Sequence, residues 1–249
     1  MKALITGASS GIGRDIAKEL SERGVELILV ARRTDRLNEL ANELKVKADV
    51  ITCDVSSQEE CMRLYEAVKP MDIDILVNNA GFGLFGFFSE SDLNRELEMV
   101  DVNIKAVHIL TKLFLQDFKK KDSGYILNVA SSAAFLPGPL LSVYYATKAY
   151  VLRLSEAIYE ELKREKSRVS ISVLCPGPVR TEFDKTANVK FSVKGLESRQ
   201  VAKTAVKGMF SKKLIIIPGF LMKAARILER FLPEKWLLKA AYHMQKRKA

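Results

Sequence analysis

The amino-acid sequence predicts an α/β protein built on a doubly wound parallel sheet of about seven strands, with an extra helical segment at its C-terminal end. Short apolar runs alternate with longer amphipathic segments along most of the chain. The apolar runs are continuous, as is typical of parallel strands that helices cover on both faces. A chain of 249 residues suits one large domain better than two small ones.

Each element is assigned from this alternation. Strands are expected at residues 2–6, 25–30, 48–53, 73–77, 124–129, 169–175 and 214–217. Helices are expected at 12–23, 34–44, 57–68, 91–119, 142–165 and 197–211, with more helix after residue 219. Thr34 is a suitable N-cap for the second helix. The segment 183–196 is the best loop candidate, and the chain has no internal repeat, low-complexity linker or clear domain break.

Composition argues against several classes of protein. The apolar content of 48% and the charged content of 28% are ordinary for a soluble globular protein. The three cysteines, Cys53, Cys61 and Cys175, have neither an even count nor a metal-like spacing, which favours a reducing cytoplasm. Because the chain has only two histidines, His108 and His243, we expect no zinc site and no metal catalysis.

No targeting or membrane-spanning segment is apparent in the sequence. The first apolar residues give way to glycine and serine too soon for a signal peptide. The longest apolar run covers residues 214–222, far short of the roughly 20 residues that cross a bilayer. The chain is therefore expected to be cytoplasmic, or at most peripheral at a membrane surface.

The net charge of +10 is unevenly distributed. Residues 1–184 contain 24 Lys and Arg against 27 Asp and Glu, whereas residues 185–249 contain 16 against 3. Such an asymmetry concerns partners rather than fold. Since no nucleic-acid reading motif accompanies the basic segment, nucleic-acid binding is not expected.

The segment LITGASSGIGRDIAKEL places Gly7, Gly11 and Gly13 between the first strand and the first helix. Glycines at such a junction let backbone N–H groups approach a pyrophosphate closely at the positive end of a helix. The alternative is a tight turn without a ligand. Because the triplet follows a strand and opens a helix, the context favours dinucleotide binding.

The end of the second strand bears on which dinucleotide binds. An NAD site carries Asp or Glu near this position for the ribose 2′-hydroxyl. This chain has Ala31 there, followed by Arg32 and Arg33. It lacks the carboxylate that would repel a 2′-phosphate and has guanidinium groups that can bind one. We expect NADP(H) in preference to NAD(H); the alternative is that the arginines only solvate a helix start.

Two adjacent tyrosines precede a lysine in the segment SVYYATKAYV. Lys148 follows Tyr144 by four positions and Tyr145 by three. Both spacings place the lysine on the same helix face as the tyrosine. Helical periodicity alone therefore does not choose between the two phenols.

Six motifs that occur in one order resemble the short-chain dehydrogenase/reductase family. They are TGASSGIG at 6–13, NNAG at 78–81, DVN with Asn103, NVASS with Ser131, YYATK at 144–148 and PGPVRT at 176–181. The resemblance covers residues 1 to about 217, and it implies one Rossmann-like domain at 1–217 with a basic amphipathic extension at 218–249. In that family a serine precedes the catalytic tyrosine by 13 residues and a lysine follows it by four. Both spacings select Tyr144, and Tyr145 becomes a packing residue or part of a neighbouring contact.

The resemblance implies a catalytic set of Asn103, Ser131, Tyr144 and Lys148. A free phenol with a pKa near ~10 exchanges protons poorly at neutral pH. The ammonium of Lys148, together with a positively charged nicotinamide, would stabilise the phenolate and lower the pKa of Tyr144. Ser131 would donate a hydrogen bond to the substrate oxygen. Asn103 would hold a water near Lys148, which would also bind the nicotinamide ribose.

The resemblance also implies further cofactor contacts. Residues 54–55 would meet the adenine, 79–81 would line the adenosine ribose and brace the central strand, and 176–181 would meet the nicotinamide. The expected cofactor-binding residues are Gly7, Ser9, Ser10, Gly11, Ile12, Gly13, Arg32, Arg33, Asp54, Val55, Asn79, Ala80, Gly81, Tyr144, Lys148, Pro176, Gly177, Val179 and Thr181.

Two apolar loops follow strands at the expected mouth of the site. They contain Phe82, Leu84, Phe85, Phe87 and Phe88 on one loop, and Phe135, Leu136, Pro137 and Leu140 on the other. Such loops suit a hydrophobic carbonyl substrate; the alternative is that several of these rings pack the core or a subunit contact. The segment 183–196 resembles the variable substrate loop of the family.

The C-terminal extension combines an apolar stripe with basic residues. The stripe consists of Leu221, Ala224, Ala225, Leu228 and Leu232, and the basic residues are Lys223, Arg226, Arg230, Lys235 and Lys239, followed by a final KRK. Pro233 separates a first helix from a second one that contains Trp236. The extension has three interpretations: it lies on an anionic membrane surface, it caps the cleft or joins subunits, or it is a solvated tail.

The leading functional hypothesis is an NADPH-dependent oxidoreductase that interconverts a ketone or aldehyde and an alcohol. A 3-oxoacyl group is one substrate option, for which the basic extension would favour an acidic carrier or a CoA phosphate. The alternative is a non-catalytic regulator or scaffold that binds NADPH. The family resemblance further implies a homodimer or homotetramer joined through the long helices.

Overall fold

The computed structural model describes residues 1–183, residue 187 and residues 195–246. Seven strands form one sheet in the order β3-β2-β1-β4-β5-β6-β9, and all of their pairings are parallel. The strands are β1 (Lys2–Thr6), β2 (Glu26–Ala31), β3 (Ala48–Thr52), β4 (Ile75–Asn78), β5 (Tyr125–Val129), β6 (Ser170–Leu174) and β9 (Ile215–Ile216). The predicted fold class and seven strands are confirmed.

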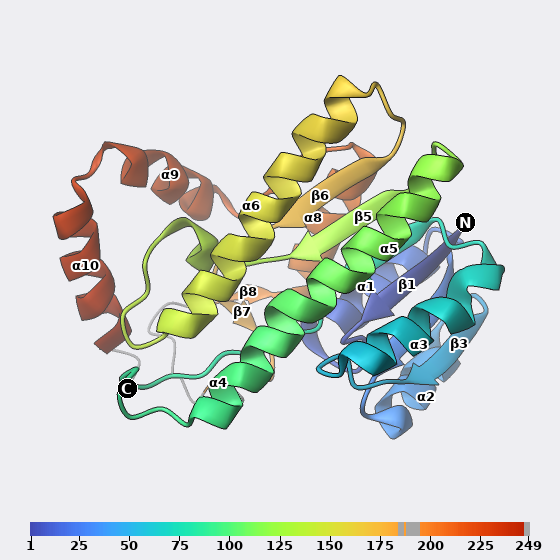
Figure 1. The fold of residues 1–249 in the computed structure, drawn as a ribbon, viewed down its shortest axis with the longest axis horizontal. Coiled ribbons are helices and arrows are strands. Elements are labelled where there is room, and N and C mark those ends of the chain that lie inside the picture. Colours follow the sequence, from blue (N-terminus) through green and yellow to red (C-terminus); the bar gives the residue numbers. More distant parts are fainter. Residues whose placement is uncertain (184–186, 188–194, 247–249) are drawn as a thin grey trace.

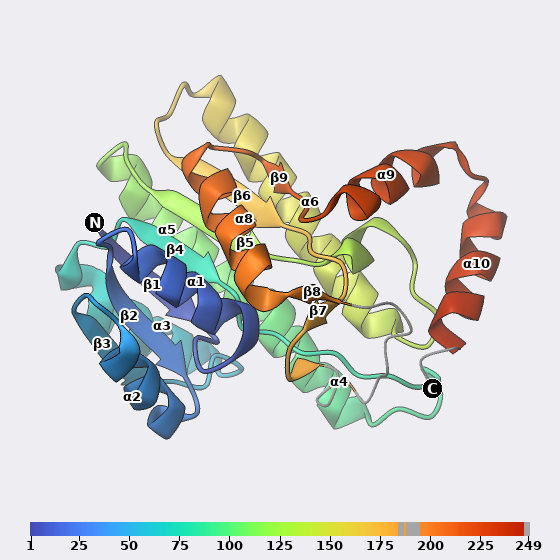
Figure 2. The same cartoon turned by 180° about the vertical axis from the view of Figure 1, so that it is seen from behind.

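Helices cover both faces of the sheet. They are α1 (Gly11–Ser21), α2 (Thr34–Glu43), α3 (Gln58–Val68), α4 (Leu93–Val100), α5 (Val107–Lys120), α6 (Ser142–Arg164) and α8 (Ser198–Phe210). Figure 1 shows α3, α5 and α6 in front of the sheet, and the reverse view in Figure 2 shows α1, α2 and α8 in front. The molecule is therefore a three-layer α/β/α sandwich.

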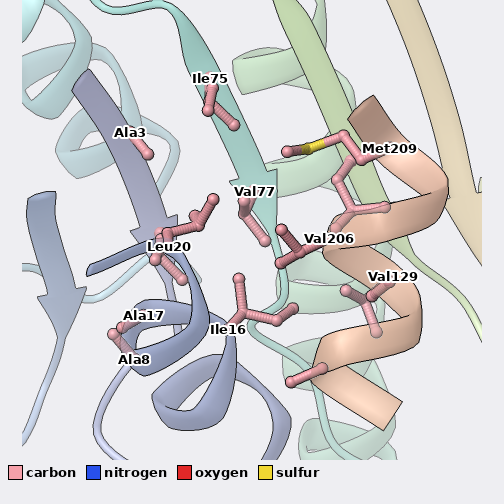
Figure 3. Close-up of a cluster of buried hydrophobic side chains, with 14 of the residues drawn as sticks. Ala3, Ala8, Ile16, Ala17, Leu20, Ile75, Val77, Val129, Val206 and Met209 are labelled. Carbon is pink, nitrogen blue, oxygen red and sulfur yellow. The ribbon is translucent and has the colours of Figure 1, made fainter. Parts of the chain in front are cut away.

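The strands alternate their side chains between two apolar cores. Ala3 and Ile5 of β1 pack with α1 and α8 in one core, part of which Figure 3 shows between the sheet and these helices. Leu4 points to the opposite face and packs with residues of α3, α5 and α6. Because both faces are buried, the strands need apolar residues at every position, which explains their continuous apolar runs.

The order of the strands places a cleft. The chain runs outward from β1 through β2 to β3, then returns to β4 on the other side of β1 and continues through β5 and β6 to β9. The direction of winding therefore reverses between β1 and β4. Loops that leave the carboxyl ends of strands at such a reversal diverge to opposite faces and leave a crevice for a ligand.

The helix predicted over 91–119 is interrupted in the structure. Asp92 caps α4, and its side chain accepts a hydrogen bond of 2.8 Å from the Arg95 N–H. A π-helical turn at Asp101–Ala106 then joins α4 to α5. Such turns insert one extra residue per turn and often occur at functional sites. The interruption lies in the turn that contains the buried Asn103.

The prediction of Thr34 as an N-cap is wrong by one residue. Helix α2 begins at Thr34 itself, and the capping position is Arg33, which makes no side-chain capping bond. The Thr34 hydroxyl instead forms a hydrogen bond of 2.6 Å with the hydroxyl of Thr52 at the end of β3. The Thr34 hydroxyl therefore joins the start of α2 to the end of β3 and does not cap the helix. The local sequence around Thr34 gives no sign of this contact.

The region of the predicted loop 183–196 is only partly described, and residues 184–186 and 188–194 lie outside the described residues. On its two sides, β7 (Val179–Arg180) pairs in parallel with β8 (Leu196–Glu197) as a separate two-stranded sheet. The helices of the extension, α9 (Phe220–Leu228) and α10 (Glu234–Lys246), lie beyond the loop between β5 and α6 in both views. Residues 247–249, which include most of the final KRK, also lie outside the described residues.

No helix among the described residues is long and apolar enough to cross a membrane. The described part of the chain also has no group of three or more His, Cys, Asp or Glu side chains that could hold a metal ion.

Candidate active site

A cleft of about 470 Å³ opens at the carboxyl ends of β1, β4 and β5. It runs without interruption from the glycine loop after β1 to the tyrosine pair on α6. Of the predicted site residues, all but Gly13 and Asn103 line this cleft. The structure therefore brings together residues that are more than 170 positions apart in the chain.

The glycine loop has its shape for identifiable reasons. Gly7 has a φ of +65°, which disfavours residues with a Cβ. A Cβ on Gly13 would overlap the side-chain amide of Asn79 and the carbonyl of Gly7. Helix α1 begins at Gly11, with Ser10 at its capping position, so its first backbone N–H groups lie at the cleft. This end of a helix attracts anions.

The segment after β4 braces that loop. The Asn79 side-chain amide donates to the carbonyls of Thr6 at 3.0 Å and Gly7 at 3.1 Å. The Thr6 hydroxyl accepts from the backbone N–H groups of Asn79 at 3.0 Å and Ala80 at 3.2 Å. Four hydrogen bonds thus tie the first and fourth strands together at the reversal of the sheet. Thr6 is a positioning residue that was not among the predicted site residues, although it opens the TGASSGIG motif.

The two arginines after β2 have different surroundings. Arg32 lies 3.6 Å from a carboxylate oxygen of Asp54 and 3.3 Å from one of Glu98. Arg33 donates to the hydroxyls of Ser9 at 3.1 Å and Ser10 at 2.9 Å. Arg33 therefore reaches across the cleft to the glycine loop. Arg32 instead lies beside Asp54, the residue predicted to contact the adenine.

A further charge cluster lies at this end of the cleft. Glu182 forms ion pairs with Arg33 at 2.9 Å and with Arg36 at 2.6 Å. Hydrogen bonds from these two guanidinium groups lower the pKa of Glu182 to about 2. Neither Glu182 nor Arg36 was predicted as a site residue. The only available signal was that Glu182 directly follows the PGPVRT motif.

Tyr144 and Ser131 meet at the other end of the cleft. Burial raises the pKa of the Tyr144 phenol above its ordinary value, and a side-chain hydrogen bond with Ser131 acts in the opposite direction. The Ser131 oxygen accepts a hydrogen bond of 3.1 Å from the Ala133 N–H. This bond uses only one lone pair of the Ser131 oxygen, so the hydroxyl keeps its own proton to donate to a ligand in the cleft.

Lys148 lies one helical turn beyond Tyr144 on α6. Its ammonium nitrogen is 5.8 Å from the centroid of the Tyr144 ring and donates a hydrogen bond of 3.0 Å to the Val129 carbonyl. Burial lowers the pKa of Lys148 to about 8. In the chain by itself, burial thus has a larger effect on the Tyr144 phenol than the nearby ammonium does. The expected lowering of the pKa of Tyr144 remains a prediction for the protein with a bound, positively charged nicotinamide.

Asn103 lies behind the cleft and is fully buried. Its amide nitrogen donates to the Phe82 carbonyl at 2.9 Å and to the Thr147 hydroxyl at 3.0 Å, and its oxygen accepts from the Phe82 N–H at 3.1 Å. Asn103 and Lys148 also approach one point beside Gly81. A Cβ there would lie 2.9 Å from the Asn103 oxygen and 3.1 Å from the Lys148 nitrogen.

Tyr145 packs against the loop that precedes α6 and against α10. Its ring lies directly over Gly138, where a Cβ would overlap the ring, and its hydroxyl is hydrogen-bonded to Gln245 of α10. It also lines the cleft. The predicted role of Tyr145 in packing and in a neighbouring contact is consistent with these positions.

The apolar loops contribute less to the cleft than expected. Of the nine predicted apolar loop residues, only Phe82 lines it, and the guanidinium of Arg95 lies 4.2 Å from its ring centroid. Phe87 and Phe88 are exposed. Phe183, whose ring lies 5.2 Å from that of Tyr144, was not among the predicted site residues. It begins the segment 183–196, for which the sequence predicted only a loop.

The extension contacts the residues around the substrate end of the cleft. Met222 packs over Gly177, where a Cβ would lie 2.7 Å from the methionine sulfur. The Arg226 guanidinium lies 4.2 Å from the centroid of the Phe135 ring. With the hydrogen bond between Gln245 and Tyr145, these contacts connect both α9 and α10 to the catalytic side of the sheet.

Comparison with known proteins gives related sequences over most of the chain. Residues 1–190 match the family model for short chain dehydrogenases. An uncharacterised oxidoreductase from Staphylococcus epidermidis is 36% identical over 207 residues, which cover 82% of this chain and 88% of that protein. The very-long-chain 3-oxoacyl-CoA reductase of Mus musculus is 34% identical over 169 residues, 65% of this chain and 54% of the mouse protein.

Solved structures resemble the fold over nearly its whole length. A short-chain dehydrogenase from Sphingobium yanoikuyae in complex with NADPH has a TM-score of 0.82 and 28% identity, covering 94% of this chain and 96% of that one. A short chain dehydrogenase/reductase from Burkholderia phymatum in complex with NAD has a TM-score of 0.83 and 25% identity, covering 91% and 92%.

Proposed function

Because the chain belongs to the short-chain dehydrogenase/reductase family and is an oxidoreductase of that family, we propose that it interconverts a hydrophobic ketone or aldehyde and the corresponding alcohol with NADP(H). The single observation that carries this proposal is the continuous cleft. It joins the glycine loop and Arg33 at one end to Tyr144, Ser131 and Lys148 at the other.

The donors along the cleft fit a nicotinamide dinucleotide. The first N–H groups of α1 and the loop from Gly7 suit the pyrophosphate. Asp54 and Val55 suit the adenine, and the segment 79–81 suits the adenosine ribose. We place the nicotinamide between Lys148 and the segment 176–181, which line the same end of the cleft. The bound cofactor supplies hydride to the substrate carbon.

Arg33 supports a preference for NADP(H) over NAD(H). It lies at the adenosine end, and its donors converge with the hydroxyls of Ser9 and Ser10. This set of a guanidinium and two hydroxyls can bind a phosphate monoester, and the Glu182 carboxylate at this end is already ion-paired with Arg33 and Arg36. The related structures contain NADPH in one case and NAD in the other, so the preference depends on these side chains.

Tyr144 is the proposed proton donor to the substrate oxygen. The Ser131 hydroxyl lies near enough to the phenol to oppose the rise of its pKa, so a carbonyl oxygen that contacts both groups receives two donors. Both interactions strengthen as negative charge develops on that oxygen during reduction. Tyr144 is protonated at neutral pH, and because burial makes it a weaker acid, efficient donation would require Lys148 and a positively charged nicotinamide to lower its pKa.

Lys148 and Asn103 would return a proton to Tyr144. The ammonium of Lys148 has a pKa of about 8, close to neutral pH, so it can lose and regain a proton readily. We place a water molecule in the space beside Gly81 that the Asn103 oxygen and the Lys148 nitrogen both approach. Such a water would connect Lys148 to the interior of the kinked turn at Asp101–Ala106.

The substrate is proposed to be hydrophobic, with a 3-oxoacyl group as one option. Phe82, Leu141 and Phe183 line the cleft near Tyr144, and apolar walls of this kind exclude water from the reacting carbonyl. The mouse relative is named as a very-long-chain 3-oxoacyl-CoA reductase. The match covers only 54% of the mouse protein. The substrate class in the name of that protein therefore serves as a starting point for a substrate screen.

We propose that the extension caps the substrate end of the cleft and rests on an anionic membrane surface. Its contacts through Met222, Arg226 and Gln245 support the cap. Its outer side carries exposed large apolar residues, namely Phe220, Leu221, Ile227, Leu228, Phe231, Leu232, Trp236, Leu238 and Met244. Residues 218–249 contain eight Lys and Arg against two Glu. Apolar side chains beside basic ones favour an anionic lipid surface.

A homodimer or homotetramer through the long helices is also proposed. Leu93 and Leu97 on α4 are 65% and 52% exposed, and Tyr150 on α6 is exposed at the same side as its hydrogen-bond partner His108 of α5. Exposed leucines on α4 beside an exposed tyrosine and histidine on the long helices α6 and α5 suit a symmetric contact. Sedimentation of the purified protein would measure the assembly.

A substrate screen with both cofactors tests the proposed function. The panel should contain ketones, aldehydes and 3-oxoacyl thioesters of increasing chain length, each assayed with NADPH and with NADH. We expect oxidation of NADPH with at least one apolar carbonyl and slower oxidation of NADH. If neither cofactor is oxidised with any member of the panel, the non-catalytic alternative is favoured.

A further inference from the structure

Glu182 occupies the end of the cleft where an anion is expected. Its two carboxylate oxygens are divided between two guanidinium groups, Arg33 at 2.9 Å and Arg36 at 2.6 Å. Arg33 simultaneously donates to the hydroxyls of Ser9 and Ser10. Two guanidinium groups thus hold one carboxylate at the adenosine end, and one of these groups is also bonded to two hydroxyls.

This set of donors matches a phosphate better than a carboxylate. A phosphate monoester carries about −1.5 to −2 charges at neutral pH and three strong acceptor oxygens. A carboxylate carries one charge and two oxygens. Arg33 is the capping residue of α2 and Arg36 lies in its first turn, so their guanidinium groups can bind separate oxygens of one anion.

Glu182 reaches this position from a distant part of the chain. It follows β7 (Val179–Arg180) and lies 149 positions after Arg33. It is joined to β7 through Thr181, which lines the cleft. The carboxylate is held ionised well below neutral pH by Arg36 and Arg33, which lower its pKa to about 2. It therefore competes for these arginines over the whole working range of pH.

We propose that Glu182 is an internal competitor for the 2′-phosphate of the cofactor and so determines how tightly NADP(H) binds. The inference rests on the proposed preference for NADP(H). Before cofactor binds, Glu182 neutralises Arg33 and Arg36. A 2′-phosphate displaces the carboxylate because it brings more charge and one more acceptor oxygen. A ribose 2′-hydroxyl has no charge with which to displace it, and NAD(H) leaves the ion pairs in place.

The expected effect is modest because the ion pairs are partly exposed. The side chains of Arg33, Arg36 and Glu182 are each about 40% exposed, and ion pairs at such positions contribute little individually. Removing the competing carboxylate should tighten the binding of a 2′-phosphate by about two- to tenfold.

Calorimetry with two nucleotides tests the inference without requiring activity. The wild-type protein, Glu182→Gln and Glu197→Gln are titrated with 2′,5′-ADP and with 5′-ADP. Glu197 is the matched control, because it is ion-paired with Arg180 on the same small sheet. Both variants remove one negative charge, so a general change in electrostatic attraction would affect them equally.

We expect Glu182→Gln to bind 2′,5′-ADP two- to tenfold more tightly and 5′-ADP with unchanged affinity, whereas Glu197→Gln leaves both affinities unchanged. Equal or weaker binding of 2′,5′-ADP by Glu182→Gln would overturn the inference, and so would equal gains in both variants. In these cases a wild-type preference for 2′,5′-ADP would leave the proposed function intact. If the wild-type protein binds both nucleotides equally, the proposed preference for NADP(H) is wrong and the inference falls with it.

Discussion

The ammonium nitrogen of Lys148 lies 5.8 Å from the centroid of the Tyr144 ring, and both residues belong to the first turns of α6. The helix fixes this separation, and the hydrogen bond from Lys148 to the Val129 carbonyl fixes the direction of the ammonium group. Burial raises the pKa of Tyr144 and lowers the pKa of Lys148 to about 8. Burial in the same apolar environment therefore makes Tyr144 a weaker acid and the Lys148 ammonium a stronger one.

Lys148→Met should change how stability depends on pH. Folding lowers the pKa of Lys148 from 10.5 to about 8, so between these values the unfolded chain binds a proton that the folded chain has lost. Stability rises with pH where the unfolded state binds more protons, by up to about 1.4 kcal/mol per pH unit for one group. The free energy of unfolding of the wild-type protein should therefore rise relative to that of Lys148→Met from pH 8 to 10. Parallel curves in denaturant titrations would show that Lys148 titrates normally.

Gly81→Ala should impair proton return. The new methyl group would lie 2.9 Å from the Asn103 oxygen and 3.1 Å from the Lys148 nitrogen, and would crowd the space proposed for a water molecule. We expect turnover at saturating cofactor to fall by about ten- to hundredfold. Gly86→Ala is a useful comparison in open space, although its φ of +157° adds backbone strain. If Gly81→Ala turns over as fast as the wild-type protein, the space beside Gly81 has no part in proton return.

Asn103→Ala should lower the free energy of unfolding of the protein as well as its turnover. The substitution leaves the Phe82 N–H and carbonyl without their partner at 3.1 and 2.9 Å in a buried site. An unpaired buried polar group costs about 1–3 kcal/mol. Asn94→Ala, at an exposed position of α4, should change the free energy of unfolding by less than about 0.5 kcal/mol. Equal losses for the two variants in urea titrations would mean that the bonds of Asn103 to Phe82 do not stabilise the fold.

Trp236 should report contact between the extension and a membrane. It is the only tryptophan of the chain and is 68% exposed. Vesicles with anionic lipid should shift its fluorescence emission to shorter wavelength, because the indole enters an apolar layer beside basic residues. Zwitterionic vesicles should give a smaller shift, and the double substitution of Lys235 and Lys239 by Glu should reduce the response. An emission spectrum unchanged by anionic vesicles would contradict the proposed membrane contact.

Local patterns were sufficient to predict the layers of the fold. Continuous apolar runs with glycine or polar residues between them predicted all seven strands of the main sheet, because strands buried on both faces have no other composition. The break of helix 91–119 at Asp101–Ala106 was not predictable in this way. Its cause is tertiary, since the buried amide of Asn103 bonds to Phe82 and Thr147 on two other segments.

The resemblance to the family was sufficient to group part of the site. It implied that Ser131, Tyr144 and Lys148 act together, and all three line the same cleft. Glu182 was missed because its partners Arg33 and Arg36 are 149 and 146 positions away in the chain. A contact between residues so far apart in the chain depends on the direction that the chain takes after β7. Neither composition nor periodicity predicts that direction.

The tyrosine pair offers the most direct test of the account. Turnover of Tyr144→Phe and Tyr145→Phe should be measured with the best substrate of the screen at saturating NADPH, with 2′,5′-ADP affinity as a control for folding. We predict a loss of at least about hundredfold for Tyr144→Phe and near wild-type turnover for Tyr145→Phe, with unchanged nucleotide affinity in both. Retained turnover in Tyr144→Phe, or a larger loss in Tyr145→Phe, would contradict the assignment of Tyr144 as the proton donor.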